Sequence, residues 1–300
     1  TKMILQQKKS MVKKSGLLEL IDTPASLNDI GGLDVLKDYL LNKSRVIADL
    51  PKAIDFGVSI PKGVFIVGMP GCGKSLCAKA SAALFNTPLL KLDMGSMMGK
   101  YVGESEGNLR KAIKIAEAAA PCVLWIDEIE KAFSGVDGNN DIMTRMFGYF
   151  LSWMQEKKSC VYVIATANKI KDLPLELKRK GRFDEIFCVN LPNKEERKKI
   201  FKIHIGKKNK SLDEAALNSV CQITEGFNGA DIESVVNEAM EKCFIDSLDN
   251  KGTAFDGKLF KDIASKTISI SESDKQQIEN MKKAFKENNF KDATTGDPTT

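Results

Sequence analysis

The chain has 300 residues, of which 43% are hydrophobic and 28% are charged, and its formal net charge is +5. This balance is ordinary for a soluble globular protein, and a chain of this length buries a sizeable core without disulfides or metal ions. A single histidine, and seven cysteines without a Cys-x-x-Cys pair, exclude a structural zinc site and a His-Glu-x-x-His metalloprotease.

The sequence also indicates location and partners. Its basic residues form short runs, which favour a solvated surface over a nucleic-acid-binding face, so nucleic acid is not an expected partner. No apolar run reaches the ~18–20 residues of a membrane-spanning helix, and no signal peptide is visible. Scattered free thiols are typical of a reducing compartment, so we expect a cytoplasmic protein.

The N-terminal part of the chain is polar. Residues 1–26 are predicted to be a linker, or the end of a missing N-terminal region, because the chain begins with Thr1 and not with Met. Gly31 and Gly32 form a flexible joint. Residues 34–48 then carry apolar side chains at the spacing of an amphipathic helix.

The next part alternates between strands and helices. Short apolar runs predict strands at residues 64–67, 88–93, 122–127, 161–166 and 185–189. Helical spacing predicts helices at residues 74–86, 104–119 and 141–156. This alternation predicts an α/β domain over residues 27–192, with a parallel sheet sandwiched by helices. Ligands then bind at the carboxyl ends of the strands.

After Pro192 the strands stop. Helices are predicted at residues 195–205, 213–222 and 229–248, with further helix around residues 262–263 and 275–285. We therefore predict a small all-α lid domain with a C-terminal helix over residues 193–288. The remaining residues, 289–300, are small and polar and are predicted to be a disordered tail.

A glycine-rich loop follows the first of these strands and begins the next helix. Residues 68–75 read Gly-Met-Pro-Gly-Cys-Gly-Lys-Ser, which is the P-loop pattern in its expected context. The glycines let backbone N–H groups point at phosphate oxygens, at the positive end of a helix. Lys74 is predicted to neutralise the β- and γ-phosphates, and Ser75 to bind Mg²⁺. The predicted ATP or ADP contacts here are Pro70, Gly71, Cys72, Gly73, Lys74, Ser75 and Leu76.

Polar side chains also lie next to three further predicted strands: two of the strands are followed by them, and the last strand is preceded by them. Asp127 and Glu128 follow an apolar strand, and we expect Asp127 to hold the Mg²⁺ shell and Glu128 to polarise the attacking water. Asn168 is predicted to bind the γ-phosphate or that water, although an asparagine after a strand is usually a turn former. Arg179 and Arg182 precede the last strand; from spacing alone a basic surface turn is favoured, and the alternative is a pair that stabilises the transferred phosphoryl group.

The combination of motifs resembles the AAA+ superfamily, and within it the AAA clade of the valosin-containing protein and the proteasomal ATPases. Residues 68–75 match Walker A, residues 123–128 Walker B, Asn168 sensor 1 and residues 179–184 the arginine-finger stretch. The chain is more closely similar to single-module AAA ATPases encoded in algal plastids and in cyanobacteria. That resemblance implies ATP hydrolysis with Mg²⁺, catalysed by Lys74, Asp127, Glu128, Asn168, Arg179 and Arg182, and extends the expected location to the plastid stroma.

The resemblance also implies nucleotide contacts outside the P-loop. Residues 29–32, Asp-Ile-Gly-Gly, match a segment of that clade whose backbone contacts adenine, and residues 226–231 match its helical lid. The implied nucleotide-binding residues are Asp29, Ile30, Gly31, His204, Gly229 and Ala230. Ala230 stands where other AAA+ branches place a sensor-2 arginine.

The loop after the second predicted strand corresponds to the pore loop of that clade. Its aromatic–hydrophobic–glycine signature is Tyr101, Val102 and Gly103, and a ring of Tyr101 side chains would offer apolar contacts to an extended polypeptide. Lys100 would add positive charge at the mouth of the pore. The alternative is that Tyr101 packs against its own domain. A second pore loop at residues 135–140 is equally well explained as an exposed loop.

These expectations lead to a homo-hexameric ATPase ring that remodels or unfolds a polypeptide by threading it past Tyr101. One alternative is a nucleotide-dependent assembly scaffold, which complete hydrolysis motifs disfavour. Another is a nucleic-acid-linked motor, which the mild charge and the lack of a recognisable nucleic-acid-binding module disfavour.

Overall fold

The computed structural model describes residues 12, 15–22, 25–92, 97, 104–132, 141–169, 174–179, 181–249, 252–288 and 290–295. Contacts within the chain divide it into two compact units. The α/β unit comprises Thr1–Leu27, Val35–Gly68 and Lys74–Cys188, and the helical unit comprises Asn28–Asp34, Met69–Gly73 and Val189–Thr300.

The α/β unit is built on a mostly parallel sheet. Its strands are β1 (Leu18–Ile21), β2 (Gly63–Gly68), β3 (Leu89–Leu92), β4 (Cys122–Ile126), β5 (Val161–Ala167) and β6 (Glu185–Val189). They lie in the order β1-β3-β4-β5-β2-β6. The strands from β3 to β2 pair in parallel, and β1 pairs antiparallel with β3. All residues of β2, β4 and β5 are buried, as expected for parallel strands covered on both faces.

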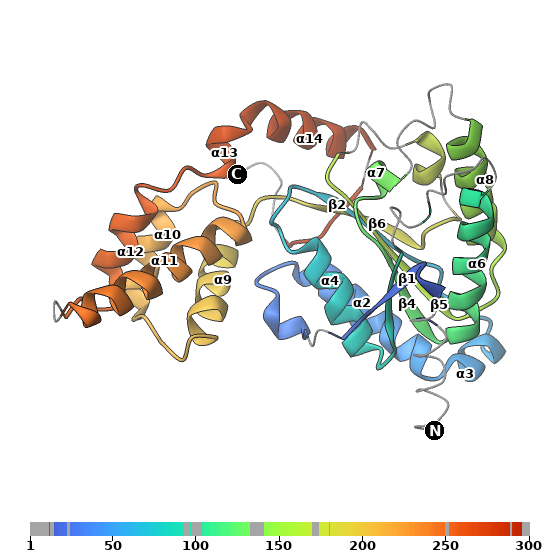
Figure 1. Cartoon of the computed structure of the whole chain (residues 1–300), viewed down its shortest axis with the longest axis horizontal. Helices are drawn as coiled ribbons and strands as arrows, with labels where there is room; N and C mark the ends of the chain where they lie inside the picture. The colour runs from blue at the N-terminus through green and yellow to red at the C-terminus, as the bar shows by residue number, and fades with distance from the viewer. Residues whose placement is uncertain are drawn as a thin grey trace. The chain divides into compact units, whose positions relative to one another are not determined.

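Helices cover both faces of this sheet. They are α2 (Asp34–Ala48), α3 (Leu50–Asp55), α4 (Lys74–Leu84), α6 (Glu104–Ala119), α7 (Ile129–Ala132) and α8 (Asp141–Glu156). The chain moves from β2 to β3 in one direction across the sheet and then returns through β4 to β5. Right-handed crossovers therefore put α4 on one face and α6 with α8 on the other, which Figure 1 shows. The predicted fold class is confirmed.

Strand β1 was not predicted from the sequence. It lies within residues 1–26, which the sequence suggested were a linker, and its register pairs Leu18 with Leu92 and Ile21 with Leu89. Four residues that include one charged side chain give too short a pattern to identify a strand, so the pairing with β3 decides its structure.

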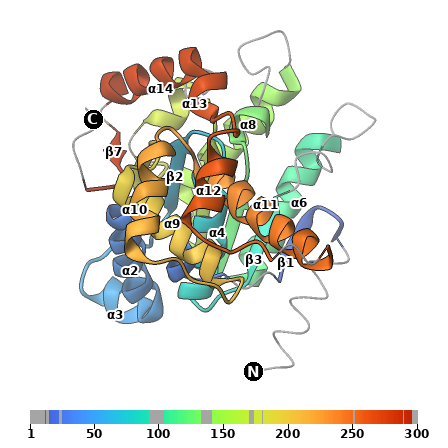
Figure 2. The same ribbon diagram turned by 90° about the vertical axis from the view of Figure 1, so that its left-hand side faces the viewer.

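The helical unit contains the predicted lid helices. They are α9 (Lys194–Gly206), α10 (Glu214–Ile223), α11 (Gly229–Leu248), α12 (Gly257–Ala264), α13 (Ile270–Ser273) and α14 (Lys275–Asn288). Figure 2 shows α9, α10, α11 and α12 grouped together. Side-chain caps begin several of them: Asn193 with Glu196, and Asn228 with Asp231, form capping boxes at α9 and α11.

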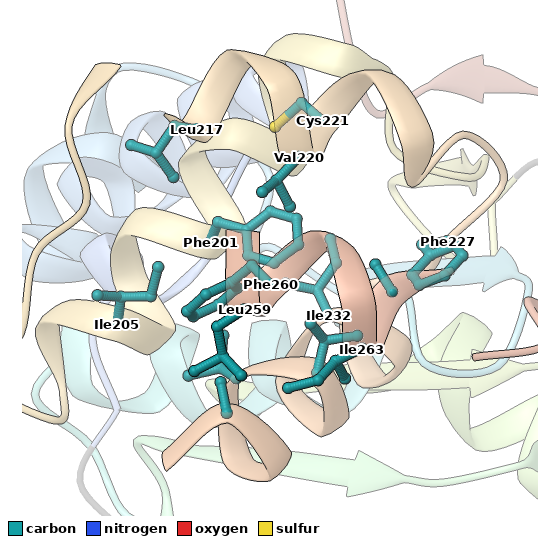
Figure 3. Close-up of a cluster of buried hydrophobic side chains, with 14 residues drawn as sticks. Phe201, Ile205, Leu217, Val220, Cys221, Phe227, Ile232, Leu259, Phe260 and Ile263 are labelled. Atoms are coloured by element: carbon teal, nitrogen blue, oxygen red, sulfur yellow. The ribbon is translucent and has the colours of Figure 1, made fainter. Parts of the chain in front are cut away.

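The core of the helical unit lies among α9, α10, α11 and α12. Phe201, Val220, Ile232 and Phe260 are fully buried there and converge in Figure 3. The aromatic rings of Phe201 and Phe260 meet edge to face, with centroids 6.3 Å apart. Burial of these side chains provides the main stabilisation of the unit, since each large apolar side chain contributes roughly 1.5–3 kcal/mol.

Residues 290–295 pack within the helical unit, although the sequence places them in a disordered tail. They include the short strand β7 (Lys291–Asp292), and Ala293 is fully buried. The Asn190 amide donates to Asp292 across 3.1 Å, and the Thr294 hydroxyl donates to Glu196 across 2.8 Å. The boundaries of the predicted domains remain a prediction. Within the described part of the chain, none of the helices has the length and apolar character to cross a membrane.

Candidate active site

The carboxyl ends of three neighbouring strands bring four of the predicted catalytic residues together. The strands β4, β5 and β2 lie side by side and run in parallel. Asp127 and Glu128 follow β4, Asn168 follows β5, and Lys74 begins the helix after β2. The direction of chain crossing reverses between β5 and β2, and such a switch point is where parallel sheets bind their ligands.

Lys74 and Ser75 are the first residues of α4. Lys74 is only 6% exposed, and its ammonium group donates to the carbonyl oxygen of Gly68 across 2.8 Å. The Ser75 hydroxyl lies 3.4 Å from Oδ1 of Asp127. A hydroxyl and a carboxylate at this spacing are hard oxygen donors, and they fit Mg²⁺, which prefers one or two carboxylates together with phosphate oxygens and water.

Asp127 has polar partners from two other strands. The hydroxyl of Thr166, in β5, donates to Oδ1 of Asp127 across 2.7 Å. The ammonium group of Lys91, in β3, lies 3.4 Å from Oδ2 and 4.5 Å above the ring of Trp125. Protein groups therefore contact both oxygens of the Asp127 carboxylate, Thr166 at Oδ1 and Lys91 at Oδ2.

Glu128 sits in a strained backbone conformation, because its φ of +49° lies in the left-handed region that non-glycine residues rarely adopt. Both of its carboxylate oxygens are engaged. The side-chain amide of Asn168 donates to Oε1 across 2.8 Å, and the ammonium group of Lys131 donates to Oε2 across 2.8 Å. The hydrogen bond with Glu128 raises the pKa of Lys131.

A second glutamate lies beneath this cluster. Glu130 is 6% exposed, and its Oε1 accepts the backbone N–H of Asn168 across 2.9 Å. Burial raises the pKa of Glu130, and the nearby Glu128 raises it further. Glu130 therefore fixes the backbone of Asn168, while the Asn168 side chain is directed to Glu128.

The two predicted arginines follow the short 3-10 helix η2 (Leu175–Lys178). Arg179 is exposed, whereas the guanidinium of Arg182 donates to the carbonyl oxygen of Glu176. The residues after them are anchored: Phe183 stacks on Phe65 with centroids 5.3 Å apart, and Asp184 pairs with Lys43 across 3.1 Å. The C-terminal end of this stretch is thus fixed on the α/β unit.

In the helical unit, the segment 28–34 packs against α9. The carboxylate of Asp29 pairs with Lys207 across 2.8 Å, and Ile30 is buried. A Cβ atom added at Gly31 would lie 2.8 Å from the backbone nitrogen of Ile200, so only glycine permits this approach. These contacts hold the backbone of the predicted nucleotide-contacting segment.

The tip of the P-loop, residues 69–73, contacts the start of α11 within the helical unit. The side-chain amide of Asn228 donates to the carbonyl oxygen of Pro70 across 3.0 Å. Gly71 has a φ of +72°, and an added Cβ would lie 2.7 Å from Cγ of Asn228. A Cβ at Gly229 would lie 2.8 Å from the carbonyl oxygen of Gly71. The predicted contacts Pro70, Gly71 and Gly229 are thus brought together.

The remaining predicted nucleotide contacts differ in their surroundings. His204 is half-buried on α9, with Nδ1 3.9 Å from a carboxylate oxygen of Glu233 on α11, and burial lowers its pKa. Ala230 is exposed in the first turn of α11, and Cys72, Gly73 and Leu76 are half-buried. The predicted pore-loop residues Lys100, Tyr101 and Val102, and the second loop at residues 135–140, lie outside the described residues.

Sequence reasoning missed three polar residues of these clusters: Thr166, Lys131 and Asn228. Each had a usable signal. Thr166 is the one threonine in a buried, largely apolar strand, Lys131 follows Glu128 by three positions on a helical turn, and Asn228 is a favourable N-cap residue before α11. Their partners depend on strand register and tertiary contacts, which these local patterns do not give.

Comparisons with known proteins show which family the chain resembles. The family described as "ATPase family associated with various cellular activities (AAA)" matches residues 64–191, and the AAA+ lid domain matches residues 214–254. The AAA domain-containing protein ycf46 of Pyropia yezoensis is 42% identical over 281 residues, which are 93% of this chain and 56% of that protein. The ycf46 protein of Guillardia theta is 45% identical over 245 residues, which are 81% of this chain and 48% of that protein.

A more distant relative and a solved structure extend the comparison. The ATP-dependent zinc metalloprotease FtsH 2 of Salinibacter ruber is 32% identical over 232 residues, covering 75% of this chain and 34% of that protein. The crystal structure of the FIGL-1 AAA domain matches with a TM-score of 0.73 at 22% identity, covering 94% of this chain and 95% of that domain. This chain spans about half the length of the ycf46 relatives that it matches.

Proposed function

Since this chain belongs to the AAA family of ATPases, we propose that it cleaves ATP at the cluster formed by Lys74, Asp127 and Glu128. A water oxygen attacks the γ-phosphorus, and the bond from that phosphorus to the β–γ bridging oxygen breaks. ADP leaves with the bonding electron pair, and the water gives one proton to the carboxylate of Glu128.

The neighbouring side chains have distinct roles in this reaction. Lys74 and the backbone N–H groups of residues 71–75 bind the phosphates at the start of α4. Ser75 and Asp127 would hold Mg²⁺, which neutralises the charge of the phosphate oxygens when it is bound. Asn168 holds the carboxylate of Glu128 toward the attacking water. Lys131 contacts the other carboxylate oxygen, and each carboxylate oxygen keeps a further lone pair that can accept the proton.

One observation carries the proposal: Lys74, Ser75, Asp127, Glu128 and Asn168 converge at the ends of three adjacent parallel strands. Their arrangement supplies a phosphate-binding cation, a pair of magnesium donors and an oriented base. An adenine-contacting role for Asp29, Ile30, Gly31 and His204, and for Gly229 with Ala230, is part of the same proposal and rests on the resemblance to the AAA clade.

We further propose that each catalytic site is completed by a neighbouring copy in a homo-hexameric ring, located in the cytoplasm or the plastid stroma. Arg179 is exposed on the α/β unit, so it is available to a neighbour. Arg182 is held by the backbone of Glu176, which fixes the stretch that would present both guanidinium groups. An arginine supplied in this way typically accelerates phosphoryl transfer by ~10³–10⁵-fold.

Mixing two inactive variants tests the shared site. The double variant Arg179→Ala/Arg182→Ala keeps Glu128 but supplies no arginine to the catalytic site of its neighbour. The Glu128→Gln variant supplies the arginines to its neighbour but cannot cleave ATP at its own site. An equal mixture should recover about a quarter of wild-type turnover, because a heterologous ring joins an intact base to an intact arginine at that frequency. Glu128→Gln mixed with Lys74→Ala is the control without recovery, since both changes damage the same half of the site.

Two results would contradict the shared site. One is a double arginine variant that hydrolyses ATP at the wild-type rate by itself. The other is a mixture that remains inactive although both variants assemble, as judged by sedimentation with ATP.

For the use of this energy we propose the remodelling or unfolding of a polypeptide that passes Lys100, Tyr101 and Val102. This proposal rests on the resemblance of residues 101–103 to the pore loop of the AAA clade. Tyr101→Ala should keep ATP turnover and lose client unfolding, measured with a fluorescent protein that carries an unstructured tag. Unfolding at the wild-type rate by Tyr101→Ala would refute the role of this loop.

A further inference from the structure

The hydroxyl group of Thr166 joins the two acidic residues of the site. Thr166 lies near the carboxyl end of β5 and is 1% exposed. Its hydroxyl donates to Oδ1 of Asp127 across 2.7 Å and accepts the backbone N–H of Glu128 across 3.1 Å. One buried side chain on β5 therefore contacts the side chain of one acidic residue and the backbone of the next.

The direction of these two hydrogen bonds is fixed by the chemistry of the groups. A backbone N–H only donates, so the hydroxyl oxygen accepts from Glu128 and its single hydrogen is directed to Asp127. The carboxylate of Asp127 is thereby oriented by a donor from inside the sheet. Its other partners, Ser75 and Lys91, lie 3.4 Å away, so the bond from Thr166 is the shortest of those described.

The bond to Glu128 acts on a strained position. With a φ of +49°, the backbone of Glu128 is in a conformation that persists only where surrounding contacts hold it. The backbone N–H of Glu128 donates to the hydroxyl of Thr166, and the carboxylate of Glu128 accepts hydrogen bonds from Asn168 and Lys131. Relaxation of the backbone at this residue would swing the carboxylate away from the point where Asn168 meets it.

We propose that Thr166 is a positioning residue for ATP hydrolysis, which sets the carboxylate of Asp127 and the backbone of Glu128 together. This inference rests on the proposed function. It assigns Thr166 a task different from that of Asn168, which contacts the side chain of Glu128 and not that of Asp127. Because the hydroxyl reaches both residues, its loss should disturb the magnesium-dependent binding and the chemical step at once.

The test compares Thr166→Val with Thr166→Ser. Valine keeps the shape of threonine and removes the hydroxyl, whereas serine keeps the hydroxyl and removes the methyl group. The control is Thr224→Val: Thr224 is equally buried in the helical unit, and its hydroxyl donates to the carbonyl oxygen of Val220 across 3.0 Å. For each variant we would measure kcat, KM, the melting temperature and the affinity for a fluorescent ATP analogue with Mg²⁺ or with EDTA.

For Thr166→Val we expect kcat to fall about 10–100-fold, with KM changed less than about threefold, because the loss affects the transition state more than binding. Mg²⁺ should increase the affinity of Thr166→Val for the ATP analogue less than it increases that of wild type. The Mg²⁺ concentration that gives half-maximal turnover should be higher for the variant than for wild type. Thr166→Ser should stay within about threefold of wild type in kcat and keep its magnesium response. Thr224→Val should match wild type in turnover.

A Thr166→Val variant with wild-type kcat and magnesium response would overturn the proposal. So would a Thr166→Ser variant as impaired as Thr166→Val, because packing of the methyl group would then matter and not the hydroxyl. If Thr166→Val does not fold, Thr166→Ala and Thr166→Ser provide the same comparison. If wild type binds the analogue but never cleaves ATP, the proposed function fails, while the magnesium response of binding still decides the role of Thr166.

Discussion

The side-chain amide of Asn168 meets Oε1 of Glu128 across 2.8 Å, and the two residues follow neighbouring parallel strands. The backbone of Asn168 is fixed in turn by the buried carboxylate of Glu130, 2.9 Å from its N–H. Asn168 is therefore a rigid donor, and the position of the Glu128 carboxylate follows from it. In the proposed mechanism, the predicted sensor residue acts through the predicted base.

Replacing Asn168 by alanine should slow the chemical step and spare binding. The variant loses one hydrogen bond to a charged group, which corresponds to a fall of about 10–100-fold in kcat, while KM stays within about threefold. Steady-state kinetics with an enzyme-coupled phosphate assay measure both constants. The control is Asn190→Ala, whose side chain contacts Asp292 in the helical unit. Equal kcat values for Asn168→Ala and wild type would show that this contact does not position the base.

Asn228 allows a separate test of the P-loop tip. Its Oδ1 caps α11 and its Nδ2 donates to the carbonyl oxygen of Pro70. Asn228→Asp keeps the cap but replaces the donor with a carboxylate oxygen, which repels the carbonyl oxygen of Pro70. Because this displaces the tip of the P-loop, ATP affinity should weaken about tenfold. Asn228→Ser also caps well and brings no negative charge, so its loss should be smaller. Isothermal titration with ATP gives the affinities, and the melting temperature checks the cap.

The Asn228 contact would be irrelevant to nucleotide binding if the Asp and Ser variants bound ATP as tightly as wild type. A loss of affinity accompanied by a melting temperature that falls equally in both variants would also contradict the interpretation, because the cap itself would then be the cause.

Lys157 should make stability depend on pH in the alkaline range. Its side chain is 8% exposed, and its ammonium group donates to the carbonyl oxygens of Pro61 and Val161 across 3.1 and 2.6 Å. Burial lowers the pKa of Lys157 to about 8, which the charge of Asp184 partly opposes. Below pH 8 both the folded and the unfolded state carry the charge, so the cost of burying it is fully present.

Between pH 8 and the unfolded pKa of 10.5 the unfolded state binds more protons, so folding becomes more favourable as the pH rises. The gain reaches at most about 3 kcal/mol. Urea unfolding of the wild-type and Lys157→Met proteins at several pH values measures this gain. Both proteins also carry Cys160→Ala, because burial raises the pKa of that nearby thiol and its titration would add to the pH dependence. A difference in unfolding free energy that stays constant from pH 7 to pH 10 would contradict the expected titration.

Glu196 should contribute much more to stability than an exposed glutamate. It is 6% exposed, and its carboxylate accepts from the backbone of Leu33 and Asn193 and from the hydroxyl of Thr294. Glu196→Gln replaces one acceptor oxygen by a donor, which should cost about 1–3 kcal/mol of unfolding free energy. Glu214→Gln is the control, because the ion pairs of Glu214 with Lys198 and Lys202 are exposed to solvent and contribute little to stability. If Glu196→Gln and Glu214→Gln shifted the urea midpoint equally, the expected stabilising role of the buried Glu196 carboxylate would be contradicted.

The sequence predicts much of this fold because its signals are local. The P-loop glycines lie within a few residues of one another, and so do the side chains of each apolar run that forms β2, β4 or β5. Parallel pairing then requires Lys74, Asp127 and Asn168 to share one edge of the sheet. The α/β architecture and the predicted catalytic cluster of the α/β unit follow from these short patterns.

Other features depend on long-range contacts that no local pattern contains. Thr166 meets Asp127 because the register pairs Ile126 with Ala165, and Asn228 reaches Pro70 from 158 positions along the chain. Strand β1 exists because β3 offers it an edge. For the pore loop, Tyr101 lies outside the described residues, so its role stays a prediction from sequence.

The chemical role of Glu128 is tested most directly by single-turnover cleavage of ATP with protein in excess, comparing wild type with Glu128→Gln. The affinity of each protein for ATP is measured alongside with a fluorescent analogue. We expect the variant to bind within about threefold of wild type and to cleave at least about 100-fold more slowly, since it lacks the base. Cleavage at the wild-type rate by a variant that binds ATP normally would show that Glu128 does not activate the water.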